Sequence, residues 1–241
     1  MSNIIYPSQS PIDLGKAQPI NFPFAEEYLK LHWEAQECGK QTGIGDLCEI
    51  VFENSKNSLD ITLPGADKPT NFDLIKYHIH SQSEHLIDGY ANPIEMHIVH
   101  EAKEVDPYNI GKFRTIYAVV AIFIDIDSRK TESDPTDSFI KGLIQNKLRS
   151  FSESEFEILN PEPIAPSNFL PEKPHEFWRY EGSLTTNRSA PNPQYVSWIV
   201  LKNPKLMPQQ TVKDFIDSWR HEPKEIQPLD RRFVFYNSSK H

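Results

Sequence analysis

The sequence predicts an α+β protein that is mostly β, built on one large sheet with a few short helices at its periphery. Three observations lead to this prediction. Strand-forming segments dominate the 241-residue chain, and helical patterning is confined to two stretches. The strand-like segments are not separated by regular helices of roughly 10–15 residues, as a doubly wound parallel fold requires. No internal repeat or Gly/Ser linker divides the chain, so we expect one domain over residues 1–241.

The predicted strands are rich in β-branched and aromatic residues. The run Tyr117-Ala-Val-Val-Ala-Ile-Phe-Ile is almost wholly apolar, which is typical of a strand covered on both faces, so we place it at the centre of the sheet. A mixed or antiparallel sheet fits this pattern. The predicted strands are residues 47–52, 59–63, 72–80, 94–100, 115–125, 195–201 and 232–236.

Two helices are expected, at residues 136–151 and 209–219. Each has a proline, Pro135 or Pro208, just before its first turn, where the missing N–H costs little.

Composition excludes several classes of protein. The net charge of −9 and the isoelectric point near 5.5 disfavour nucleic acid as a partner, because phosphate contacts draw on clustered Lys and Arg. No long apolar stretch predicts a membrane span, and we expect a soluble globular protein. The N-terminus lacks the basic start and apolar run of a secretory signal, which favours the cytoplasm or an organellar lumen. No protein partner is identifiable.

The two cysteines, Cys38 and Cys48, are separated by nine residues, which does not match a short zinc-binding spacing. We expect free thiols, and a local disulfide is the less favoured alternative.

Five of the nine histidines fall between residues 78 and 100. Alternation along a strand places His78 and His80 on one face, where two imidazoles can converge on one ion. On the segment 94–100, the same alternation puts Glu95 and His97 together and turns Met96, Ile98 and His100 away. If these strands are neighbours, His97 supplies a third ligand.

Three neutral imidazoles leave the fourth position of a tetrahedral zinc open for water, which distinguishes a catalytic site from a structural one. A ligating imidazole usually donates its other N–H to an acceptor, and Glu95 is suited to this role. For each histidine alone, an ordinary surface or core residue is the better interpretation. The paired His-x-His and Glu-x-His segments reverse that judgement, whereas the isolated histidines remain ordinary: His32, His175, His221 and His241.

Other catalytic motifs are absent from the sequence. The three His-Glu pairs are not followed by a second histidine at metalloprotease spacing, and there is no Gly-x-Ser-x-Gly or phosphate-binding loop.

The histidine segments His78-Ile-His-Ser-Gln-Ser-Glu-His and Glu95-Met-His-Ile-Val-His resemble the zinc signature of the α-carbonic anhydrase family. Further resemblance extends along nearly the whole chain in order. The resemblance implies the fold of that family, a single domain with a large, mostly antiparallel twisted sheet. The additional matching segments are Ser8-Gln-Ser-Pro-Ile-Asp, Phe177-Trp-Arg-Tyr-Glu-Gly-Ser-Leu-Thr-Thr, Tyr195-Val-Ser-Trp-Ile-Val-Leu-Lys and Gln227-Pro-Leu.

The resemblance also implies a Zn²⁺ cofactor and roles for further residues. Thr185 would accept a hydrogen bond from the zinc-bound hydroxide and donate one to Glu84, and Thr186 would lie near bicarbonate. An apolar wall would hold carbon dioxide, although ordinary core packing explains its members equally well from sequence alone. These residues are Val99, Val119, Leu184, Val196 and Trp198.

Two positions depart from the family pattern. The proton-shuttle histidine corresponds to Asn57, whose amide does not titrate near neutral pH, so we expect slower turnover unless buffer carries the proton. Lys76 stands where the family commonly has a glutamine that accepts the N–H of the first ligand. An ammonium only donates, so we expect Lys76 to turn outward.

The resulting hypothesis is a lyase, carbonic anhydrase, that reversibly hydrates carbon dioxide to bicarbonate and a proton through a zinc-bound hydroxide. The alternative is a carbonic-anhydrase-like structural or binding subunit with weak or no hydratase activity. Esterase activity ranks third, because the sequence does not separate it from promiscuity.

Overall fold

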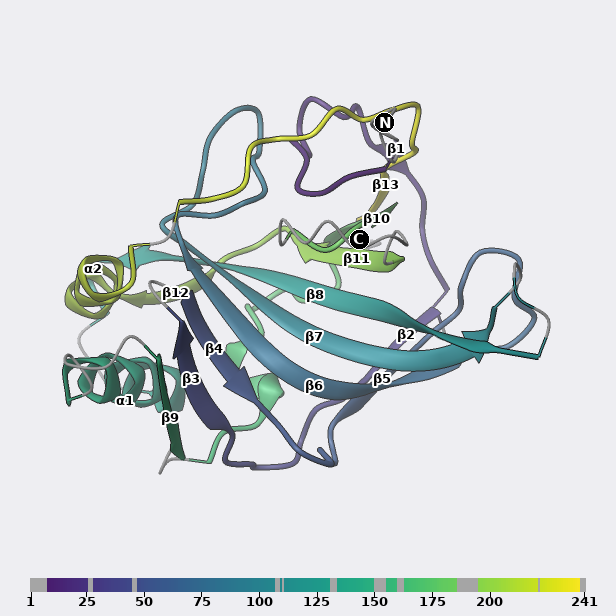
Figure 1. The fold of residues 1–241 in the computed structure, drawn as a ribbon. Helices are drawn as coiled ribbons and strands as arrows, with labels where there is room; N and C mark the ends of the chain where they lie inside the picture. The colour runs from purple at the N-terminus through teal and green to yellow at the C-terminus, as the bar shows by residue number, and fades with distance from the viewer. Residues whose placement is uncertain are drawn as a thin grey trace, which may run out of the picture.

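The computed structural model describes residues 8–25, 28–44, 47–106, 109, 111–130, 134–149, 155–159, 163–185, 195–220 and 222–238. Within these residues, thirteen strands form one twisted sheet, and the helices lie at its periphery (Figure 1). The strands are β1 (Ile20–Asn21), β2 (Leu29–His32), β3 (Lys40–Ile44), β4 (Leu47–Val51), β5 (Ser58–Ile61), β6 (Thr70–Ser81), β7 (Ile94–Val105), β8 (Phe113–Asp127), β9 (Glu155–Leu159), β10 (Phe177–Gly182), β11 (Val196–Leu201), β12 (Lys205–Pro208) and β13 (Phe235–Asn237). The helices are α1 (Pro135–Arg149), α2 (Gln209–Ser218) and the 3₁₀ helix η2 (Pro166–Phe169).

The long strands β6, β7 and β8 are neighbours and run antiparallel. On one side the sheet continues through β4, β3 and β9, and on the other through β11, β10, β13 and β1. Most pairs are antiparallel, as expected, but β8 pairs with both β11 and β12 in parallel, and β1 pairs with β13 in parallel. The fold is therefore mostly β with a mixed sheet.

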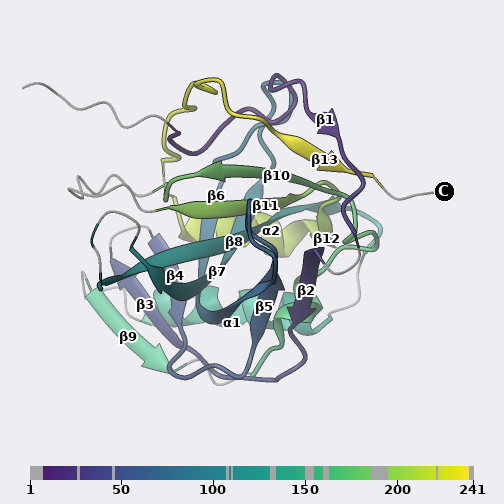
Figure 2. The same cartoon turned by 90° about the vertical axis from the view of Figure 1, so that its right-hand side faces the viewer.

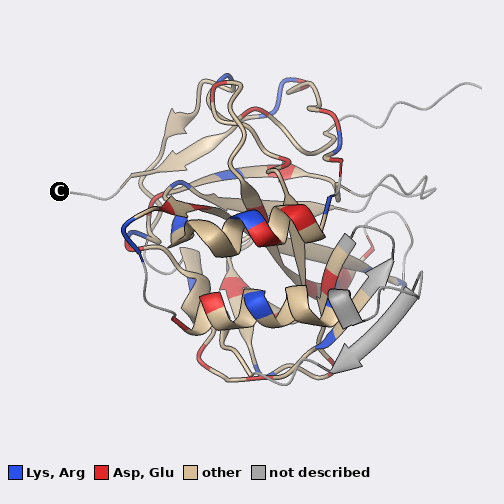
Figure 3. Ribbon diagram, turned by 90° about the vertical axis from the view of Figure 1, so that its left-hand side faces the viewer, with Lys and Arg blue, Asp and Glu red and all other residues tan. Residues whose placement is uncertain are grey.

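The two faces of β6, β7 and β8 carry different clusters. One face packs against α1 and α2 and forms the larger core, which includes Tyr77, Ile98 and Phe139. The other face forms a smaller apolar cluster with β10 and β11 and with the N-terminal residues Ile12 and Leu14. Figure 3 shows α1 and α2 side by side, with acidic and basic residues along both helices. The chemistry-bearing histidines lie on the face away from these helices.

Every predicted strand overlaps an observed one, and the 117–124 run lies in β8, at the centre of the sheet as predicted. Helix 209–219 corresponds to α2, and α1 already begins at Pro135, while residues 150 and 151 lie outside the described residues. Six further strands were not predicted from the sequence: β1, β2, β3, β9, β10 and β12. These strands are six residues or shorter, and several are polar, so pairing with neighbours rather than their own pattern makes them strands.

Cys38 is exposed, Cys48 is buried, and both are free thiols, as predicted. Within the described part of the chain, neither α1 nor α2 is long and apolar enough to cross a membrane.

Candidate metal centre

The third histidine reaches the other two because β6 and β7 pair in a suitable register. His78 lies directly opposite His97, and His80 lies opposite Glu95. Alternation along both strands puts all four side chains on one face of the sheet. They are almost fully buried, with exposed fractions of 5% or less. The pairing that the sequence analysis required for a third ligand is therefore present.

The three imidazoles converge on one point. One ring nitrogen from each of His78, His80 and His97 lies within 4.8 Å of the others. The ring centroid of His80 is 4.5 Å from that of His78 and 4.7 Å from that of His97. An ion bound by these nitrogens would have three nitrogen ligands from two neighbouring strands.

Glu95 orients His97. His97 Nε2 lies 2.8 Å from Glu95 Oε1, and because an ionised carboxylate only accepts, Nε2 carries the hydrogen and Nδ1 is left for a metal. Burial alone would raise the pKa of Glu95, but His85 and His97 hold it well below its usual range. Glu95 is thus an ionised acceptor in the position expected from the sequence.

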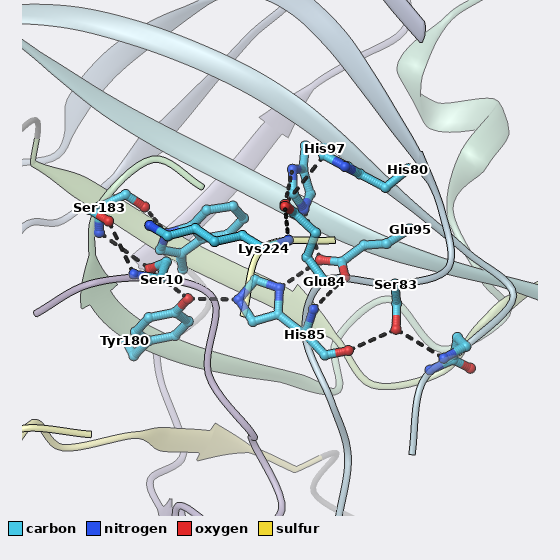
Figure 4. Close-up of polar contacts among 12 residues, drawn as sticks. Ser10, His80, Ser83, Glu84, His85, Glu95, His97, Tyr180, Ser183 and Lys224 are labelled. Atoms are coloured by element: carbon cyan, nitrogen blue, oxygen red, sulfur yellow. Dashed lines mark hydrogen bonds and ion pairs between the residues drawn. The ribbon is translucent and has the colours of Figure 1, made fainter. Parts of the chain in front are cut away.

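A buried hydrogen-bond network extends behind Glu95 (Figure 4). The carboxylate accepts from His85 Nδ1 at 2.6 Å and from the His85 backbone N–H at 2.8 Å. His85 Nε2 lies 2.6 Å from the Tyr180 hydroxyl, which donates to Ser10 Oγ at 2.9 Å. No role was predicted from the sequence for His85, Tyr180 or Ser10. The only sequence signals were the position of His85 in the histidine cluster and the motifs that contain the other two.

Glu84 is a second buried carboxylate beside the histidines, close to His80 and His97. Its Oε2 lies 3.4 Å from His80 Nε2 and 4.0 Å from His97 Nδ1, and its Oε1 accepts from the Lys224 backbone N–H at 3.4 Å. Burial alone would raise the pKa of Glu84, but His80, His97 and a hydrogen bond with Thr185 together lower it. The structure thus brings Glu84 and Thr185 together beside the histidines.

Four of the five expected wall residues are buried in one apolar cluster, with Leu184 half-buried against it. Trp198 contacts the His97 ring at a centroid distance of 4.9 Å, and its indole N–H donates to the Ser183 carbonyl. The cluster therefore adjoins the histidines. Thr186 lies outside the described residues. The buried four are Val99, Val119, Val196 and Trp198.

Asn57 and Lys76, the two residues that depart from the family pattern, both form side-chain contacts in the structure. Asn57 is buried, and its amide bonds both backbone groups of Ala35 and donates to Glu37 Oε2 at 2.7 Å. Lys76 does not turn into solvent: its ammonium lies 2.6 Å from Glu49 Oε2, and its side chain is 30% exposed. Glu49 lies opposite His78 on β4, so Lys76 remains on the histidine face.

The isolated histidines keep their ordinary interpretation where the structure describes them. His32 is exposed and pairs with Asp60 at 3.0 Å, and His175 is exposed, whereas His221 and His241 lie outside the described residues.

Comparison with known proteins gives a consistent result. The model of the family described as eukaryotic-type carbonic anhydrase matches residues 4–238. Carbonic anhydrase 7 of Homo sapiens is 26% identical over 223 residues, which cover 86% of this chain and 75% of that protein. A carbonic anhydrase of Nostoc sp. is 32% identical over 165 residues, covering 68% of this chain and 53% of that protein.

Solved structures of this family share the fold. The α-carbonic anhydrase of Thermovibrio ammonificans, in complex with the inhibitor sulfanilamide, superposes with a TM-score of 0.69 at 23% identity. The alignment covers 95% of this chain and 86% of that one.

Proposed function

The chain belongs to the eukaryotic-type carbonic anhydrase family, and we propose that it is a zinc enzyme that reversibly hydrates carbon dioxide to bicarbonate and a proton. The observation that carries this proposal is the convergence of His78, His80 and His97 within 4.8 Å of one another.

The chemistry of this donor set fits zinc. Three imidazole nitrogens are a common set for a catalytic zinc, and buried neutral imidazoles suit it better than Mg²⁺ or Ca²⁺. No fourth His, Cys, Asp or Glu completes the group among the residues that the structure describes, which leaves a position for water. Glu95 supports the set by fixing the tautomer of His97.

Zinc in such a site lowers the pKa of a coordinated water to about 7, as is established for carbonic anhydrase, and so supplies hydroxide at neutral pH. Thr185 would orient this nucleophile. Because its single hydroxyl hydrogen is directed to the ionised Glu84, its oxygen can only accept a hydrogen bond from the incoming group. Thr186 is proposed to line the same polar side.

The apolar cluster beside His97 is suited to carbon dioxide, a small molecule without hydrogen-bond donors. Val99, Val119 and Val196 would form its floor, with Trp198 and Leu184 at its sides. The same cluster would exclude water from the substrate and weaken the retention of charged bicarbonate, which favours release of the product.

The proton released in each cycle has no carrier at Asn57. The amide does not titrate, and its donors and acceptor are already committed to Ala35 and Glu37. Turnover is therefore expected to depend steeply on the concentration of buffer.

The first test is zinc content together with stopped-flow hydration of carbon dioxide, for the parent and for His97→Ala. We expect one zinc per chain, hydration that rises with buffer concentration, and loss of both zinc and hydration in the variant. His32→Ala, which removes an exposed histidine, is the control and should behave as the parent. Full zinc occupancy without hydration would contradict the enzyme and favour the alternative, a structural or binding subunit. No zinc in the parent would refute the metal site itself.

A further inference from the structure

A groove on the far side of the sheet from the histidines is large enough for a small molecule. Its volume is about 740 Å³, within the range of roughly 300–1,000 Å³ typical of ligand sites. Its apolar lining packs against the larger core, on the helix side of the sheet, so it is separate from the metal centre. We call it the apolar groove, and its main lining residues are Phe24, Tyr28, Leu29, Leu31, Leu170 and Phe177.

A second groove of about 400 Å³ meets the apolar groove at Leu170, which lines both. Three lysines line this lysine groove: Lys130, Lys173 and Lys205. Lys173 stands at the junction, since the next residues along the chain, Pro174 and His175, line the apolar groove.

The lysine groove has more positive than negative charge among the described residues. Asp134 lies 2.8 Å from the ammonium of Lys130 and 3.7 Å from that of Lys205, so one carboxylate serves two cations. Glu172 is the acidic residue of the lining. Lys173 is exposed, and no ion pair joins it to the described part of the chain. In a chain of net charge −9, this local excess favours an anionic ligand.

The edge of the sheet beside the apolar groove is protected against an added strand. The N–H of Ile20 donates to the carbonyl of Val234, just before β13, and that of Phe22 donates to Tyr236 in β13, so the backbone N–H of Asn21 points outward. The residues on either side of it on that edge, Pro19 and Pro23, have no N–H to donate. Figure 2 shows β1, β2 and β13, which border this region, on the same side of the molecule. An extended peptide is therefore disfavoured as the occupant.

We propose that the two grooves form one binding site for an amphipathic monoanion, a carboxylate with a hydrocarbon tail. The tail lies among the aromatic and leucine side chains of the apolar groove, and the carboxylate lies at Lys173, near Lys130 and Lys205. This proposal does not depend on zinc or on hydratase activity, because none of its residues contacts the histidines.

The test is calorimetric titration of the full chain with decanoate and, for comparison, with the uncharged decanol. We expect one saturable decanoate site per chain and weaker binding of decanol. Lys173→Glu should lower the affinity for decanoate by about two- to fivefold, as expected for the loss of one exposed ion pair, and should leave decanol binding unchanged. The matched control is Lys68→Glu, because Lys68 is an exposed lysine outside both grooves.

A second variant tests the apolar groove from an exposed position. Ala25 lines the groove and is exposed, so Ala25→Trp fills the cavity with little expected effect on folding. It should reduce binding of both decanoate and decanol, with carbon dioxide hydration as in the parent. The proposal is overturned if decanoate does not saturate, if decanol binds as tightly as decanoate, or if both variants bind decanoate as the parent does. Binding at the metal centre instead would give the last of these results.

Discussion

The two faces of β7 each carry a buried histidine, but the two histidines lie in different environments. His97 lies on the face of the candidate metal centre, where its Nε2 donates to an ionised carboxylate and its Nδ1 lies 4.0 Å from Glu84 Oε2. His100, three residues later, lies on the helix side, fully buried and stacked on Trp33 at a centroid distance of 5.6 Å. Its Nε2 accepts from the Trp33 indole N–H, and its Nδ1 donates to the Ile98 carbonyl.

The difference teaches that burial alone does not make a histidine functional. Burial lowers the pKa of His100 to about 3, because hydrogen bonds to the backbone of Ala118 and Ile98 offset only part of the cost of charging the buried ring. On the metal face, the carboxylates of Glu84 and Glu95 accompany the imidazoles and stay ionised. We therefore expect one face to control metal binding and the other to control stability.

The largest expected effect tests the stability side of this comparison. His100→Ala removes a buried ring and leaves the Trp33 indole N–H without its acceptor, so the free energy of unfolding should fall by about 3 kcal/mol. Urea denaturation measures this, and the zinc content of the folded variant should remain that of the parent. A loss of zinc from the folded variant would contradict the division between the faces.

The complementary change on the metal face is Glu95→Gln. The two imidazoles both donate to Glu95 Oε1, and the His85 backbone N–H donates to Oε2. An uncharged amide has one oxygen and one NH₂ group, so it does not accept from all three donors, and zinc affinity should fall about 10- to 100-fold. Competition with a chelator measures the affinity. Glu101→Gln, on the same face of β7 but half-exposed, is the control. Equal affinities for both variants would remove Glu95 from the metal centre.

The pH dependence of stability tests the burial of His100 on the helix side. The unfolded chain protonates His100 near pH 6.5 and the folded chain only near pH 3. Between these values the unfolded state binds more protons, so the free energy of unfolding should decrease as the pH falls, by up to about 1.4 kcal/mol per unit. His100→Gln keeps an acceptor but does not titrate, and its denaturation series should lack this contribution. Identical slopes for the two proteins would show that His100 titrates in the folded state.

The smallest effect concerns Asn57, a polar side chain that resembles His100 in its role. Asn57→His would supply a titratable ring, but it would break the bonds to Ala35 and Glu37, which should cost about 1 kcal/mol or more. We expect lower stability in denaturation and no faster hydration in dilute buffer. A faster variant of unchanged stability would mean that Asn57 is not a packing residue.

Much of the metal face was predictable because it depends on local periodicity. Strand alternation put His78 beside His80 and Glu95 beside His97, and it turned His100 to the other face. The apolar run of β8 likewise indicated a central strand. The ion pair between Lys76 and Glu49 was not predictable. Glu49 is 27 residues away in the sequence and becomes a neighbour only through the pairing of β4 with β6.

The sequence by itself determined the mostly β class of the fold, the histidine pairs and the family, because each depends on patterns of residues that are close together in the sequence. Only the tertiary structure decided which strands are neighbours, and therefore that His97 faces His78. It also decided that Ser10 and Tyr180, 170 residues apart, complete the network behind Glu95. Such contacts depend on sheet order and register, which local propensity does not encode.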